Sequence, residues 1–152
     1  MTVPADMICA SIGNLFETMY FSEAVSSEAG QLSSPLMAAS VTFSGPVTGV
    51  LTLAATDRLA AQLAAEFVAA EAEDLGPGQA AAIIQELANV ACGSFLAEWM
   101  PHAPFEFGIP VSLDAVPPDR VWLLRFGIGS SIPELAVDVR LSSVENSGNQ
   151  AR

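Results

Sequence analysis

The sequence predicts an α+β fold in which helices pack on one face of an antiparallel sheet. Segments with apolar residues every three or four positions, typical of helices, are separated by segments in which apolar and polar residues alternate, typical of strands. The expected order is helix, two strands, two helices and three strands, with short links between successive strands that favour antiparallel pairing. No linker divides the chain. We therefore expect one domain over residues 1–152, with a core at about 6–141 and a tail at 142–152.

The N-terminal third predicts a helix followed by a β-hairpin. Residues 7–20 carry apolar side chains at helical spacing, and Asp6 is suited to cap the helix. Residues 22–35 are rich in Ser, Glu and Gly and are expected to form a loop. Apolar and polar residues alternate over residues 39–44, a Gly-Pro turn follows, and residues 49–53 run back, which predicts the hairpin.

Two further helices and three strands complete the prediction. Thr56 or Asp57 is expected to cap the second helix. Its buried face is expected to carry Leu59, Leu63 and Phe67, extending to Val68. The third helix should run from about Gln79 to Met100, where Pro101 stops it. The strand candidates are residues 105–113, 120–126 and 135–141.

Charge and hydropathy exclude several classes of partner. The formal charge is −12, with 5 Lys or Arg against 17 Asp or Glu, so nucleic acid and anionic membrane surfaces would repel the protein. A partner that presents a positively charged surface would be attracted by this negative charge. The apolar stretch at residues 80–100 is interrupted by polar and charged side chains, which argues against a membrane span. The N-terminal residues lack the basic leader of a secretory signal, so a cytoplasmic location is expected.

The chain offers few residues for metal or nucleophilic chemistry. Cys9 and Cys92 lie in apolar helical patterns and are expected to be buried free thiols in a reducing compartment. The single histidine, His102, supports neither a zinc site nor a histidine-based triad. Four charged residues of the strand candidates are expected to face solvent: Arg120, Arg125, Asp138 and Arg140.

The third helix carries a candidate site on its polar side. Ala82, Glu86, Asn89 and Gly93 follow one another at steps of four, three and four, so they lie on one face of a helix. A glycine in a helix interior costs up to about 1 kcal/mol relative to alanine, which suggests that something approaches the backbone at Gly93. Two structural alternatives remain: the two polar side chains are solvated surface, or the glycine relieves a crowded contact with a neighbouring strand.

The segment IIQELANVACGSFL resembles the signature helix of the CheC/CheX/FliY family of chemotaxis phosphatases. In that pattern Glu, two spacer residues and Asn are followed four residues on by a small residue. The hairpin VTFSGPVTGVLTL, the helix DRLAAQLAAEF and the strand FGIPVSL are also similar to the family, over about residues 6–141. A single motif resembles the CheX branch. The first helix has Asn14 and Glu17 in the opposite order, and these are interpreted as surface residues.

The resemblance implies a CheC-like fold and a phosphatase that hydrolyses the phosphoaspartate of a CheY-like receiver domain. Glu86 would pair with the partner's active-site lysine, and Asn89 would orient a water for in-line attack, without a general base. Ala82 and Gly93 would contact the docked partner. No cofactor is expected on this chain, because the partner would hold Mg²⁺. The resemblance also implies a homodimer with a continuous sheet.

Two other function classes remain open from the sequence. The chain could be a regulatory module that binds a receiver domain or a flagellar-switch component without chemistry. A carrier of a small ligand is the third possibility, although no cluster of polar residues converges on a pocket in the sequence pattern.

Overall fold

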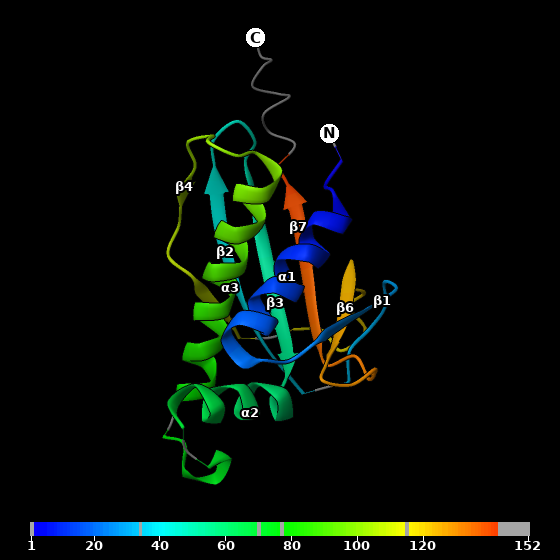
Figure 1. Cartoon of the computed structure of the whole chain (residues 1–152), viewed down its shortest axis with the longest axis vertical. Helices are drawn as coiled ribbons and strands as arrows, with labels where there is room; N and C mark the ends of the chain where they lie inside the picture. The colour runs from blue at the N-terminus through cyan, green and yellow to red at the C-terminus, as the bar shows by residue number, and fades with distance from the viewer. Residues whose placement is uncertain (1, 34, 70, 77, 115, 143–152) are drawn as a thin grey trace.

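A seven-stranded antiparallel sheet forms one layer of the structure over the described residues (Figure 1). The computed structural model describes residues 2–33, 35–69, 71–76, 78–114 and 116–142. The strand order is β1-β6-β7-β3-β2-β4, and β5 pairs with β2 beside β4. The strands are β1 (Ala24–Ser27), β2 (Leu36–Ser44), β3 (Gly49–Thr56), β4 (Glu106–Phe107), β5 (Val111–Leu113), β6 (Leu124–Ile128) and β7 (Leu135–Leu141).

The helices lie on one face of this sheet, which confirms the predicted fold class (Figure 1). α1 (Ala5–Tyr20) and α3 (Gln79–Trp99) run along the sheet, and α2 (Asp57–Val68) crosses at one end. A 3-10 turn, η1 (Ala72–Asp74), lies in the connection from α2 to α3. Residues 143–152 of the predicted tail lie outside the described residues.

The main core fills the space between the helices and the three central strands. Inward-facing strand residues are fully buried because alternate side chains of each strand point toward the helices. They include Ala39, Val41, Phe43, Leu51, Leu53, Leu135 and Val137. α3 contributes Ile83, Ile84, Leu87, Ala88, Ala91, Cys92, Phe95 and Leu96 to the same core. α3 is therefore held against the sheet along most of its length.

A second, smaller cluster lies on the opposite face of the sheet around Trp122. Asp138 projects to this face, and the prediction that it faces solvent is wrong, because the segment leading to β6 covers it. Its carboxylate accepts hydrogen bonds from the backbone N–H of Leu123 at 2.6 Å and from Arg120 at 2.9 Å. The Arg120 guanidinium also stacks 4.0 Å from the centre of the Trp122 ring.

Some predicted boundaries differ from the structure. The loop expected over residues 22–35 contains β1, which pairs with β6 some hundred residues later in the chain. A four-residue strand with one large apolar side chain gives too weak a local signal. The strand predicted over 105–113 is two short pieces, since Pro110 interrupts it and has no N–H to donate. The strand predicted over 120–126 begins only at Leu124.

The helix caps are partly as predicted. Pro4 takes the N-cap position of α1, so the prediction that Asp6 caps this helix is wrong. Asp6 lies in the first turn instead, where its negative charge favours the helix dipole. The predicted Thr56 cap of α2 is confirmed, because its hydroxyl accepts a hydrogen bond from the Leu59 N–H at 3.2 Å.

α3 is the one helix in the described ranges that is long and apolar enough to span a membrane. Its most apolar 18-residue window has a mean hydropathy of 1.4, and 44% of this window is buried inside the fold. The polar residues Gln85, Glu86 and Asn89 interrupt it. This combination is that of a central helix in a folded domain.

Candidate functional site

The four positions singled out on α3 lie on its outward side. Ala82, Glu86 and Asn89 are exposed, and Gly93 is half-buried. Residues three and four apart on a helix are neighbours, with Cβ atoms about 5–6 Å apart. The carboxylate of Glu86 and the carboxamide of Asn89 therefore project side by side from adjacent turns into solvent.

The core fixes the direction in which this strip points. Leu87, Ala88 and Ala91 are completely or almost completely buried against the sheet, so α3 cannot rotate without exposing them. The Gln85 side chain adds a lateral contact, because its Nε2 donates a hydrogen bond to the Ser112 hydroxyl of β5 at 2.8 Å. The neighbouring Glu86 is thus held on the outside by packing rather than by a polar partner.

Neither polar side chain of the strip is used by the fold. In the part of the chain that the structure describes, the Glu86 carboxylate and the Asn89 carboxamide make no hydrogen bond or ion pair with another group. Structural polar residues elsewhere in the molecule behave differently, as the Arg58–Glu134 pair shows. The two side chains are therefore free to contact a second molecule.

Gly93 faces open space. A Cβ built at this position meets no heavy atom within 4 Å, apart from the helix's own backbone nearby. The alternative that glycine relieves a crowded contact with a neighbouring strand is therefore wrong. The backbone at Gly93 is accessible from outside, beside a shallow groove of about 310 Å³ that Phe107 also lines.

The last turn of α2 departs from the prediction of a buried stripe. Phe67 and Val68 continue the apolar stripe of Leu59 and Leu63, but they are 56% and 45% exposed. The prediction that Phe67 and Val68 are buried is therefore wrong, because the core encloses Leu59 and Leu63 but not the last turn of the helix. Hydrophobic periodicity identifies the stripe but not where its cover ends.

The exposed end of the stripe borders the α3 strip. Ala64, Phe67 and Val68 of α2 and Gln79, Ala82, Ile83 and Glu86 of α3 line a notch of about 250 Å³. Glu86 is the charged member of this lining. An apolar recess and a free carboxylate thus lie next to each other, an arrangement that depends on how α2 and α3 meet and that their separate helical patterns do not reveal.

α1 also carries an Asn and a Glu on its exposed side. Asn14 and Glu17 are exposed, as interpreted from the sequence. Glu17 lies in a shallow groove with Gly13, Phe21 and Ser22. Since their order on the helix is reversed, these side chains do not repeat the pattern of α3.

Neither cysteine belongs to the outward-facing strip of α3, because Cys92 lies on the buried face of that helix and Cys9 lies on α1. Burial raises the pKa of the Cys92 thiol to about 12, so the thiol stays protonated at neutral pH. Cys9 is half-buried, and burial raises its pKa as well, partly offset by a hydrogen bond with Ser26. Within the described ranges, no group of three or more His, Cys, Asp or Glu side chains could hold a metal ion.

Comparison with known families identifies the segment that contains the site. The family model described as chemotaxis phosphatase CheX matches residues 37–117, which is just over half of the chain and includes the whole of α3. The chain belongs to the CheX family. No curated protein matches its sequence.

Solved structures with the same fold include several CheX and CheC-like proteins. CheX in a CheX–CheY–BeF3–Mg²⁺ complex from Borrelia burgdorferi superposes with a TM-score of 0.71 at 14% identity, over 93% of this chain and 100% of that one. A CheC-like superfamily protein from Shewanella sp. PV-4 gives a TM-score of 0.70 at 12% identity, over 91% and 97% of the two chains. The FliM middle domain from Vibrio alginolyticus, at 19% identity and a TM-score of 0.55, covers 93% and 94%.

Proposed function

We propose that this CheX-family protein hydrolyses the phosphoaspartate of a CheY-like receiver domain. The observation that carries the proposal is the pair of free, outward-pointing side chains, Glu86 and Asn89, on adjacent turns of α3. A receiver domain keeps its phosphoaspartate in its own active site. A phosphatase for this substrate therefore needs side chains that protrude from a firm support, and α3 provides them.

Asn89 would supply the chemistry by positioning. Its carboxamide carries both a donor and an acceptor, so it can hold a water in line with the acyl phosphate while remaining neutral. The water oxygen attacks phosphorus, the bond from phosphorus to the aspartyl oxygen breaks, and the products are inorganic phosphate and the free aspartate carboxylate. Phosphoryl transfer depends mainly on positioning and electrostatic stabilisation, so no general base on this chain is required.

Glu86 would orient the partner. Its unpaired carboxylate can form an ion pair with the lysine in the active site of the receiver domain. Mg²⁺ would be held by the receiver, where it stabilises charge on the phosphoryl group. This chain would therefore supply the Asn89 carboxamide and the Glu86 carboxylate, and the receiver domain would supply the metal ion.

The overall charge supports a basic contact surface on the partner. A net charge of −12 favours association with a positively charged region and disfavours nucleic acid and anionic membranes. We place the reaction in the cytoplasm, where receiver domains are phosphorylated. The CheX–CheY complex from Borrelia burgdorferi supports a CheY-like partner.

We also propose a homodimer that forms through an edge of the sheet. At the β4–β5 edge, Ile109 and Val111 are exposed, and unpaired backbone groups of an edge strand can pair with a second chain. Sedimentation equilibrium measures this association directly.

The competing function is a module that binds a receiver or a flagellar-switch component without chemistry. The likeness to the FliM middle domain favours it as the second candidate, although the TM-score of 0.55 is lower than that of the CheX structures. The free amide of Asn89 favours the phosphatase.

The test measures phosphate release from a panel of receiver domains charged with acetyl phosphate and Mg²⁺. We expect the wild type to accelerate release and Asn89→Ala to lower kcat by at least about 100-fold, because the water loses its orienting group. Glu86→Gln should lower kcat/KM by about 10-fold, since the ion pair is lost while the shape is kept. Acceleration that survives in Asn89→Ala would refute the proposal, and binding without release would favour the non-catalytic module.

A further inference from the structure

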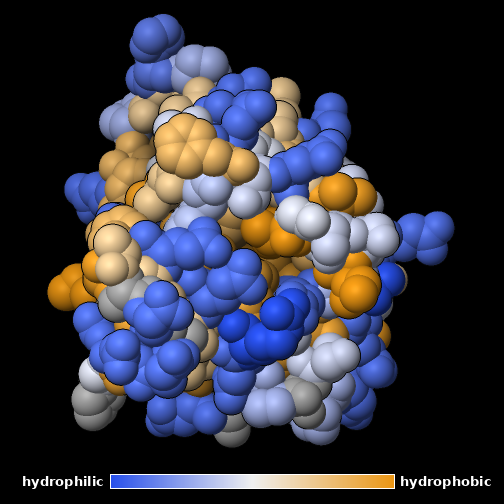
Figure 2. All heavy atoms as spheres, turned by 60° about the horizontal axis from the view of Figure 1, so that its bottom comes forward, coloured by the Kyte–Doolittle hydropathy of each residue, from blue (hydrophilic) through white to orange (hydrophobic). Residues whose placement is uncertain are grey.

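The apolar stripe of α2 continues beyond the part of the helix that is buried. Leu59 and Leu63 are buried in the main core, whereas Phe67 and Val68, one turn further, are exposed to solvent. Exposed apolar side chains that lie together beside a recess form a surface that a partner can cover. The end of the molecule where α2 lies shows patches of hydrophobic surface among hydrophilic side chains (Figure 2).

The notch formed there is a site with a floor and walls. Its volume of about 250 Å³ is several times the roughly 30 Å³ that one water occupies in the liquid. Buried Ala64 and Ile83 form the apolar base, and Phe67, Val68 and Ala82 form exposed sides. The space fits one large side chain, and Glu86 stands at its margin.

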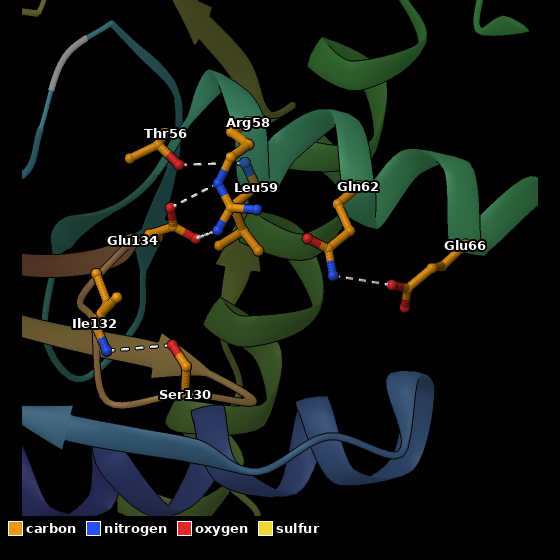
Figure 3. Close-up of polar contacts among 8 residues, drawn as sticks. All are labelled: Thr56, Arg58, Leu59, Gln62, Glu66, Ser130, Ile132 and Glu134. Atoms are coloured by element: carbon orange, nitrogen blue, oxygen red, sulfur yellow. Dashed lines mark hydrogen bonds and ion pairs between the residues drawn. The ribbon is translucent and has the colours of Figure 1, made fainter. Parts of the chain in front are cut away.

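The α2 scaffold of the notch is fixed at its N-terminal end. The Thr56 hydroxyl caps the helix, and the Arg58 guanidinium forms an ion pair with Glu134 of the β6–β7 connection (Figure 3). The Thr56 N–H also donates a hydrogen bond to the Glu134 carbonyl at 3.0 Å. A preformed recess binds at a smaller entropic cost than one that must be ordered.

The charges of the segments that flank the notch select the occupant. Exposed Glu66 lies in the last turn of α2, and exposed Glu71, Glu73 and Asp74 lie in the connection from α2 to α3, the two helices that line the notch. A symmetric contact between two copies of this chain would bring these carboxylates against their own equivalents. A partner that presents an apolar side chain next to basic groups meets the surface without such repulsion.

We infer that the notch receives an apolar side chain of the receiver domain, placed next to the lysine that Glu86 binds, and that this contact determines which receiver is recognised. The inference rests on the proposed phosphatase function and adds a specificity site to it. Glu86 forms part of both surfaces, so filling the notch and pairing with Glu86 orient the same partner. The notch contributes binding energy away from the reacting phosphorus, which lowers KM and leaves the attack by water unchanged.

The experiment compares kcat and KM for phosphate release from the receiver that the wild type dephosphorylates most efficiently. Phe67→Ser removes a wall of the notch, and Ala82→Phe fills it from the α3 side. We expect each variant to raise KM by about 10-fold with kcat within about 2-fold of the wild type. Phe21→Ser is the matched control, because Phe21 is 91% exposed at the end of α1 and outside this notch.

Urea unfolding and sedimentation accompany the kinetics, so that a folding defect or a change of assembly is recognised. An unchanged KM in both notch variants, with kcat still dependent on Asn89, would overturn the notch inference alone. Loss of a dimer in Phe67→Ser would place a second copy on the notch and overturn it as well. Failure of the wild type to release phosphate from any receiver would overturn the proposed function together with this inference.

Discussion

Gly93 provides a test in which stability and activity should move in opposite directions. Replacing Gly93 with Ala adds a Cβ into open space, since no heavy atom lies within 4 Å apart from the nearby helix backbone. Alanine is favoured over glycine in a helix interior by about 0.5–1 kcal/mol. For a protein of this length, that increment corresponds to a rise of about 1–4 °C in Tm.

Activity should fall because the same open space is where the partner is proposed to approach. Gly93→Gln introduces a residue that favours helix formation but adds a long side chain, so we expect kcat/KM to fall by at least about 10-fold, or about 1.4 kcal/mol. Gly13 offers a matched control. It lies in the interior of α1, and a Cβ there also meets nothing within 4 Å. Gly13→Ala and Gly13→Gln should stabilise the fold without loss of activity.

The assay pairs thermal unfolding with phosphate release from a charged receiver domain. A fall in Tm for Gly93→Ala would show that the space is not open. Equal activity of Gly93→Gln and Gly13→Gln would show that the partner does not approach this backbone, and the docking role of Gly93 would be refuted.

Two further predictions concern stability. Asp138→Ala should lower the free energy of unfolding by about 3 kcal/mol in urea titrations, because it leaves the Leu123 N–H and the Arg120 guanidinium without their acceptor. The control is Arg140→Ala: the Arg140 guanidinium is 3.8 Å from the same carboxylate but 69% exposed, so its loss should change the free energy of unfolding by less than about 1 kcal/mol. Equal losses in the two variants would contradict the structural role of the buried Asp138 carboxylate. Burial raises the pKa of the Cys92 thiol to about 12 in the folded state, whereas a thiol in the unfolded chain has a pKa of about 8.5. Between these two pH values the folded state keeps a proton that the unfolded state loses. The free energy of unfolding should therefore fall as the pH rises through this range. Unfolding at pH 7.5 and 10 should show a smaller decrease for Cys92→Ala than for the wild type, and an identical decrease would argue against a buried thiol.

Most of the fold could be predicted from local patterns. The β2–β3 hairpin follows from two strand-like apolar segments around a Gly-Pro turn, and α3 follows from 21 residues of helical periodicity. β1 could not be predicted, because its pairing with β6 joins segments that are far apart in the sequence. The burial of Asp138 could not be predicted for a similar reason: the strand pattern gives the face of the sheet on which Asp138 lies, but the segment that leads to β6 covers that face.

The sequence by itself determined which residues share the outer face of α3, because helical spacing alone places Glu86 and Asn89 on adjacent turns. Only the tertiary structure decided that this face is uncovered and that Gly93 opens onto free space. It also decided that Phe67 and Val68 emerge beside Glu86 rather than join the core. Periodicity repeats along a helix regardless of its neighbours, whereas exposure depends on where another element ends, and that is a property of the packed chain.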